Sequence, residues 1–219
     1  MKLIIDTALR KIYFESLYIV KNEQPELWEF FCKNVPTLSV AFYNHFSTLG
    51  GLLTYIRYYK NIRENAVFYR KVWNVHKDDV IARLDKLFGY TVEDTIVAVI
   101  CVSPLYLRNI YKKIFIVPTN ADEERILEII VHELSHFYFY KSEIGNQMPE
   151  YKRWKLSEQI VPFIIKELFY DICSNSGSYV DAPNDNLKRK IYCWMDGEIS
   201  FEELLNSEWG ENRYDGYEI

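Results

Sequence analysis

Apolar positions in the first part of the chain recur at the spacing of α-helices. Residues 25–34 begin with Pro25, and proline is favoured at the first position of a helix. Residues 76–88 form a second helical pattern, followed by Gly89 where a C-terminal cap belongs. The apolar face of this pattern consists of Val80, Ile81, Leu84, Leu87 and Phe88. We therefore expect residues 1–90 to form a mainly helical N-terminal region.

From residue 95 onward, the helical spacing gives way to short runs of β-branched apolar residues. Residues 95–102 and residues 112–118 each favour a buried strand, and Pro104 and Pro118 end them. Because elements close in sequence are usually adjacent in space, we expect the two strands to be neighbours in a small sheet.

Two longer helical patterns follow the strands, at residues 121–140 and residues 151–173. Two short helices near the end complete the pattern. Capping boxes fit at two helix starts, formed by Asn120 with Glu123 and by Ser200 with Glu203. This order predicts an α+β fold. Residues 91–219 would form its core with a helical C-terminal extension, either separate from residues 1–90 or in one compact unit with them.

The composition is that of a globular protein, with 49% hydrophobic and 26% charged residues. The net charge of −5 argues against a nucleic-acid partner, which needs a basic surface. Residues 55–71 interleave Arg and Lys with aromatic residues, as some nucleic-acid surfaces do. We favour an amphipathic helix there, with long cationic side chains covering aromatic packing.

The four cysteines lie far apart and form no CxxC pair. This pattern is typical of reduced thiols in a cytosolic protein. The N-terminus lacks the long apolar run of a secretory signal, and no stretch approaches the roughly 20 apolar residues that a spanning helix needs. We therefore expect a soluble cytoplasmic protein with no membrane partner.

The residues that carry chemistry are His132-Glu133-Leu134-Ser135-His136, an HExxH motif. On a helix, side chains four residues apart share a face, so His132 and His136 can bind one metal ion. Zinc lowers the pKa of a bound water to about 7, and the carboxylate of Glu133 could take its proton. The motif is short and also arises by chance. The residues around it therefore decide whether it marks a metal site.

A helical projection of residues 121–140 supports the metal interpretation. Its main apolar stripe consists of Ile126, Leu127, Ile130, Leu134, Phe137 and Tyr138. His132 and His136 fall together on a different face, beside Ile129 and Arg125. A histidine that serves the core would more often sit singly within the stripe. Two histidines on a separate face predict a helix whose apolar face packs against a core and whose histidine face lines a cleft.

A catalytic zinc ion takes three protein ligands and leaves one position open. The helix at 151–173 offers Glu158, which falls inside an apolar stripe formed by Trp154, Val161, Ile164, Ile165, Leu168, Phe169 and Ile172. A carboxylate on a buried face is costly unless it is paired or binds metal. The alternatives are a pair with a buried Arg or Lys, or a position at the stripe's edge. Weaker candidates for the third ligand are Glu143, Glu150 and Glu167.

HELSH at 132–136, followed by Glu158 on a second helix, resembles the gluzincin branch of the zinc metallopeptidases. The strands before the motif and the order of helices are similar to those of the small minigluzincins. The resemblance covers residues 95–173. The metzincin pattern is absent, because Phe139 and Ser142 stand where its Gly and third His would be.

The resemblance implies a zincin-like core, with a two-helix zinc site beside a small sheet. Its zinc ligands would be His132, His136 and Glu158, and Glu133 would be the catalytic base. An edge strand of such a sheet binds an extended peptide by strand addition. We assign that strand to residues 112–118, with substrate contacts near Ile114 and Ile116.

The chain departs from the family at Pro162, where thermolysin-like members place an Asp that orients a ligand histidine. The sequence offers four candidates for the residue that stabilises the oxyanion and does not distinguish among them: Tyr170, Tyr179, Tyr192 and His76.

The sequence thus predicts a zinc-dependent peptidase acting on peptides or proteins. One alternative is a catalytically latent or inactive zincin-fold protein with a binding or regulatory role. Another places a nucleic-acid contact at residues 55–71 and makes the zinc structural. The oligomeric state is not predicted.

Overall fold

The computed structural model describes residues 1–7, 49–100, 108–118, 121–173 and 182–210, with the backbone alone at 49–61 and 209–210. The chain is α+β and mostly helical, as the sequence predicts for its fold class. It divides into two compact units. We call Lys2–Val75 with Asp94–Ile126 the sheet unit, and His76–Glu93 with Leu127–Ile219 the helical unit. Each unit combines residues from both sides of position 90.

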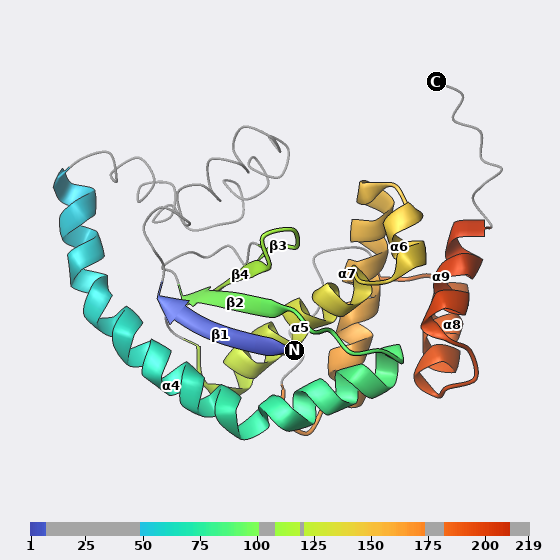
Figure 1. The fold of residues 1–219 in the computed structure, drawn as a ribbon, viewed down its shortest axis with the longest axis horizontal. Helices are drawn as coiled ribbons and strands as arrows, with labels where there is room; N and C mark the ends of the chain where they lie inside the picture. Colours follow the sequence, from blue (N-terminus) through green and yellow to red (C-terminus); the bar gives the residue numbers. More distant parts are fainter. Residues whose placement is uncertain (8–48, 101–107, 119–120, 174–181, 211–219) are drawn as a thin grey trace. The chain divides into compact units, whose positions relative to one another are not determined.

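The sheet unit contains a four-stranded mixed sheet in the order β1-β2-β4-β3 (Figure 1). The strands are β1 (Lys2–Thr7), β2 (Thr95–Ile100), β3 (Arg108–Asn109) and β4 (Ile114–Val117). β2 runs parallel to β1 and to β4, whereas the short β3 runs antiparallel to β4. The expectation that 95–102 and 112–118 are neighbouring strands is confirmed.

Two sequence-based expectations about the sheet need correction. The N-terminal region is not helical at Lys2–Thr7, where β1 pairs along its full length with β2. Residues 112–118 are also not the outer strand, because β3 pairs with β4 at Ile114 and Phe115. The outer position therefore belongs to β3 over these two residues.

Helix α4 (Leu49–Phe88) starts in the sheet unit and continues into the helical unit. Ile62, Ala66 and Tyr69 are buried on one face, so the amphipathic interpretation of residues 55–71 holds where side chains are described. The Tyr69 hydroxyl donates to the Pro118 carbonyl at 2.9 Å. The Arg70 side chain donates to the Ile5 carbonyl at 2.8 Å. These bonds join α4 to the ends of β4 and β1.

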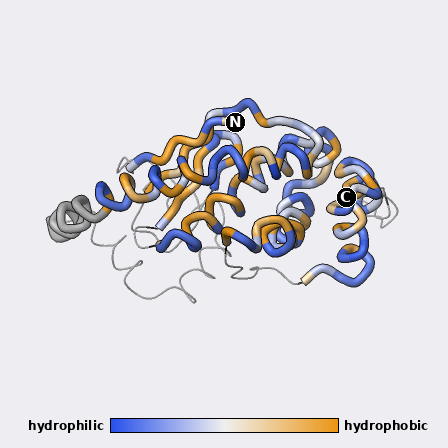
Figure 2. Tube along the Cα trace, turned by 90° about the horizontal axis from the view of Figure 1, so that it is seen from below, coloured by the Kyte–Doolittle hydropathy of each residue, from blue (hydrophilic) through white to orange (hydrophobic). Residues whose placement is uncertain are grey.

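The helical unit contains the end of α4, most of α5 (Glu123–Phe139), α6 (Glu143–Gln147), α7 (Glu150–Leu168), α8 (Asp185–Met195) and α9 (Phe201–Gly210). Hydrophobic and hydrophilic residues alternate along these helices in Figure 2, as expected when one face packs inward. Phe88 is central to an aromatic core, with ring centroids 5.2 Å from Tyr138, 5.3 Å from Trp194 and 4.8 Å from Phe201.

The helix ends follow the sequence signals closely. Gly89 has a φ of 77° and donates its N–H to the Asp85 carbonyl at 3.0 Å, which confirms the predicted C-terminal cap. Ser200 and Glu203 form the predicted capping box, each accepting the backbone N–H of the other. The capping box with Asn120 falls outside the described residues. At the start of α5, Asp122 accepts the backbone N–H of Arg125.

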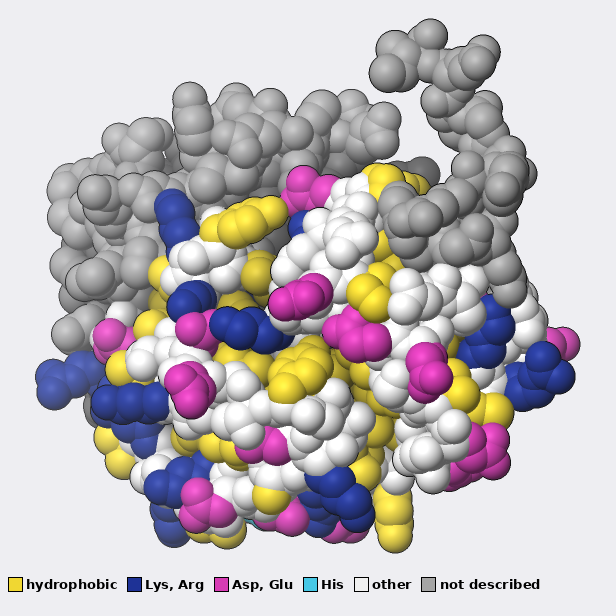
Figure 3. All heavy atoms as spheres, turned by 45° about the vertical axis from the view of Figure 1, so that its right-hand side comes forward, with side chains coloured by type: hydrophobic (Ala, Val, Ile, Leu, Met, Phe, Trp, Pro, Cys, Tyr) yellow, Lys and Arg dark blue, Asp and Glu magenta, His cyan; other side chains and the backbone are white. Residues whose placement is uncertain are grey.

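On the face drawn in Figure 3, acidic and basic side chains are interspersed and form no continuous basic surface. None of the helices in the described residues has the length and apolar character needed to cross a bilayer.

Candidate metal centre

Helix α5 places the two histidines of the motif one turn apart on one face. Their Nε2 atoms are 3.1 Å apart, and the rings meet at an interplanar angle of 69°. The side chain of His136 is fully buried, whereas that of His132 is 19% exposed. Every other side chain of α5 from Ile126 to Phe139 is buried. In this part of α5, His132 is therefore the one residue whose side chain reaches solvent, where the sequence predicted a face that lines a cleft.

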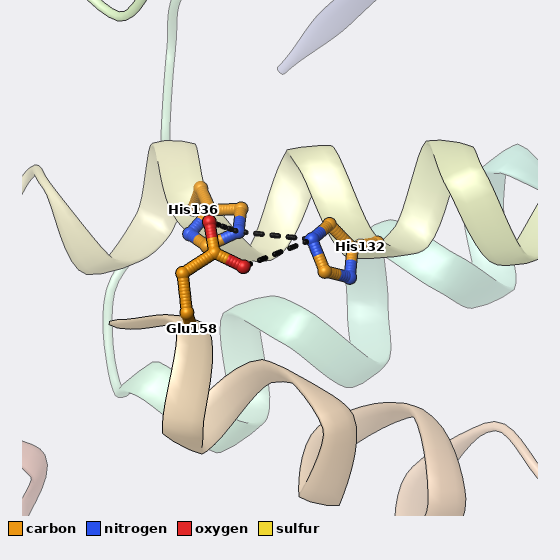
Figure 4. A group of neighbouring side chains, drawn as sticks. All are labelled: His132, His136 and Glu158. Atoms are coloured by element: carbon orange, nitrogen blue, oxygen red, sulfur yellow. Dashed lines mark hydrogen bonds and ion pairs between the residues drawn. The ribbon is translucent and has the colours of Figure 1, made fainter. Parts of the chain in front are cut away.

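Helix α7 brings Glu158 to the same point (Figure 4). Its Oε1 lies 3.5 Å from Nε2 of His136, and its Oε2 lies 3.8 Å from Nε2 of His132. The Glu158 side chain is 7% exposed, so it lies within the buried face of α7 and not at its edge. The three residues that the sequence nominates as ligands, from two helices, thus converge within the helical unit. This group could hold a metal ion.

The distances within the group agree with a shared metal ion. Zinc–ligand bonds of 2.0–2.1 Å in a tetrahedron place neighbouring donor atoms about 3.3 Å apart. The separations of 3.1, 3.5 and 3.8 Å lie close to this value, although the two longer ones use different oxygens of Glu158.

Without a metal ion, the group would be held by a hydrogen bond between the two rings and by ion pairs of Glu158 with protonated histidines. The 3.1 Å separation of the two imidazoles fits a hydrogen bond in which one ring nitrogen carries the proton. Both carboxylate separations, however, exceed the 2.7–3.2 Å range of such bonds. Burial of a carboxylate is costly unless it is paired or binds metal, and a divalent cation between the three groups is one way to offset that cost at Glu158.

The weaker ligand candidates lie outside this group. Glu143 and Glu150 are exposed, and the half-exposed Glu167 lies 3.0 Å from the Lys166 ammonium. Among the oxyanion candidates, Tyr170 is 76% exposed, and the Tyr192 hydroxyl donates to Glu167 at 3.3 Å. His76 lies in α4, and Tyr179 falls outside the described residues. Among the described His, Cys, Asp and Glu residues, neither the weaker ligand candidates nor His76 joins the group of three.

Glu133 follows the first histidine on α5, and its side chain is buried at 2% exposure. It is not one of the three converging residues. Its role as the catalytic base stays a prediction. Ile114 and Ile116 belong to the sheet unit and the three converging residues to the helical unit. Substrate contact at these two positions therefore stays a prediction.

Pro162 stands one turn after Glu158 inside α7. Proline has no N–H, so the Glu158 carbonyl lacks the donor that helix geometry normally supplies. The ring of Pro162 also offers no acceptor to a ligand histidine. A group that orients a metal-binding histidine would therefore have to come from another position in this chain.

The sequence analysis did not single out two buried charged residues near the centre. Glu128, 4% exposed, lies one turn before His132, and the four-residue spacing was the signal that could have revealed it. Arg153, 8% exposed, donates to the Asn146 side chain at 2.8 Å and lies 4.5 Å above the Tyr140 ring. Arg153 thereby joins the start of α7 to the segment that follows α5.

No protein-family model, curated protein or solved structure matches the chain.

Proposed function

We propose that this protein is a zinc-dependent peptidase with a zincin-like, gluzincin-type site. The observation that carries the proposal is the convergence of His132, His136 and Glu158 from two helices, with donor atoms 3.1–3.8 Å apart. Two imidazoles and one carboxylate are a ligand set that catalytic zinc uses, and they leave a fourth position open. The partial exposure of His132 gives this position an approach from solvent.

Each residue has a distinct role in the proposed hydrolysis. His132 and His136 would bind through Nε2, and Glu158 through its carboxylate. A bound zinc ion supplies Lewis acidity to the substrate carbonyl and lowers the pKa of water. Glu133 would accept a proton from the attacking water on a carboxylate oxygen and then deliver it to the leaving amine. The substrates are peptides or proteins. No disulfide joins the described cysteines, Cys173 and Cys193, which fits the proposed cytoplasmic location.

The test combines elemental analysis with peptide hydrolysis. We expect the wild-type chain to carry about one zinc ion after reconstitution, and Glu158→Ala to lose most of it. Glu167→Ala is the matched control, since it removes a carboxylate from the same helix outside the site. Glu133→Gln should keep its zinc and lose about 10²–10⁴-fold in turnover of a peptide library.

Two outcomes would overturn the proposal in different ways. If the wild-type chain bound no zinc after reconstitution, the proposed metal centre itself would be wrong. If the chain bound stoichiometric zinc but hydrolysed no library peptide, the proposed peptidase activity would be wrong. That outcome would favour a latent or regulatory zincin-fold protein.

A further inference from the structure

Glu128 lies on α5 one turn before His132, and its side chain is 4% exposed. A spacing of four residues puts the two side chains on the same helix face, with Cβ atoms about 5–6 Å apart. Glu128, His132 and His136 therefore form a row along α5. An extended glutamate side chain can cover this distance to a neighbouring imidazole.

The His132 ring presents its two nitrogens to different surroundings. Nε2 faces His136 and Glu158 at 3.1 and 3.8 Å. Figure 4 shows the other nitrogen, Nδ1, on the side of the ring that faces away from His136 and Glu158. Glu128 precedes His132 by one turn, on the opposite side of His132 from His136 along α5. Side chains on a helix also lean toward its N-terminus, which places the His132 ring over the turn containing Glu128.

A histidine that binds metal almost always donates its other ring N–H to a carboxylate, a carbonyl or water. Pro162 cannot fill this role, so the acceptor has to be a group at another position. We infer that Glu128 is a positioning residue that accepts the Nδ1–H of His132 and holds Nε2 toward the metal. This inference rests on the proposed zinc site and adds a residue to it.

The proposed bond has a defined chemical effect. An acceptor at Nδ1 fixes the tautomer in which Nε2 carries the lone pair, and a charged acceptor raises the basicity of that lone pair. Glu128→Gln keeps the size of the side chain and one acceptor oxygen but removes the negative charge. Zinc affinity should fall by about 10–100-fold, the range typical for the loss of such partners.

The experiment measures zinc dissociation constants by competition with a chromophoric chelator, for the wild type, Glu128→Gln and Glu124→Gln. Glu124 is the matched control because it is an exposed glutamate on the same helix. We expect the loss of affinity in Glu128→Gln alone. Glu128→Gln should also add little to the loss caused by His132→Ala, since the proposed acceptor acts through His132. A residue that merely supports the fold would weaken zinc binding equally with and without His132.

A second measurement needs no variant at position 128. In zinc-loaded wild-type protein with ¹⁵N-labelled histidine, Nδ1 of His132 should carry a proton that exchanges slowly with water. An unprotonated Nδ1 would overturn the inference, even if Glu128→Gln failed to fold. Unchanged affinity in Glu128→Gln would overturn the role of Glu128 and leave the zinc site standing. If the wild-type chain had no affinity for zinc, the proposed function on which this inference rests would be overturned.

Discussion

His132 and His136 occupy equivalent places in the motif but differ in burial. The side chain of His136 is fully buried, whereas that of His132 is 19% exposed. Burial decides how much a side chain contributes to stability, because a large buried group leaves a cavity when it is removed. The two residues should therefore be equivalent for metal binding and unequal for folding.

At this scale we predict that His132→Ala and His136→Ala both weaken zinc binding strongly but leave a residual affinity that can be measured. In the metal-free state, His136→Ala should lower the free energy of unfolding by about 1–3 kcal/mol, and His132→Ala by less than about 1 kcal/mol. Urea unfolding of the two metal-free variants measures the difference. Equal losses of stability would show that the burial of His136 contributes nothing to the fold.

The identity of the site residues was accessible from local sequence spacing. The four-residue interval predicted that His132 and His136 share a face, and a carboxylate within an apolar stripe singled out Glu158. The same interval also connects Glu128 with His132, but Glu128 lies before the HExxH motif and forms no part of it. No local spacing predicts which side chains of α5 and α7 face each other, since tertiary packing decides that.

At the scale of elements, the ends of the helices show how local chemistry sets their lengths. Helix α4 ends at Phe88, and Gly89 adopts a φ of 77° that only glycine takes without strain. A Cβ atom at Gly89 would meet nothing within 4 Å. The need for glycine there is thus conformational and not a matter of space.

We predict that Gly89→Ala lowers the free energy of unfolding by about 1–2 kcal/mol, the cost of a left-handed conformation for a residue with a Cβ atom. Gly89→Asn should cost clearly less, because asparagine tolerates this conformation better. Thermal unfolding of both variants gives the comparison. If the two variants lost equal stability, the left-handed conformation would not be the cause.

The helices were predicted better than the sheet for a physical reason. Periodic apolar residues and caps are local signals, and they predicted α5, α7 and the capping box at Ser200. Strand β1 carries no such signal, because Ile5 is its one buried residue. Its pairing with β2 joins residues at opposite sides of α4 in the sequence, and β3 spans two residues. Long-range pairing of this kind leaves no mark in the local pattern.

At the scale of the whole molecule, the candidate site residues lie in one of the two units and the sheet in the other. All three converging residues and Glu133 belong to the helical unit, whereas the sheet unit holds all four described strands. The N-terminal part of α4 is attached to the sheet by Tyr69 and Arg70. A ligand that binds only the folded helical unit should stabilise that unit most directly.

We predict that zinc slows amide hydrogen exchange in α7 and in α5 after Leu127, and changes β1, β2 and β4 much less. At a zinc concentration 100 times the dissociation constant, the added stability should reach about 2.7 kcal/mol. Exchange followed by mass spectrometry, with Glu158→Ala as the control that cannot respond, measures the pattern. Equal protection of the strands would show that the two units open as one.

The partial exposure of His132 also governs how fast a metal ion would come and go. His136 and Glu158 are closed off by packing, so an ion held between the three residues would leave past the His132 ring. The rotation of one imidazole is a far faster event than the separation of two packed helices. Exchange with a chelator would then proceed without unfolding, and the lifetime of the bound ion would depend on whatever restrains that single ring.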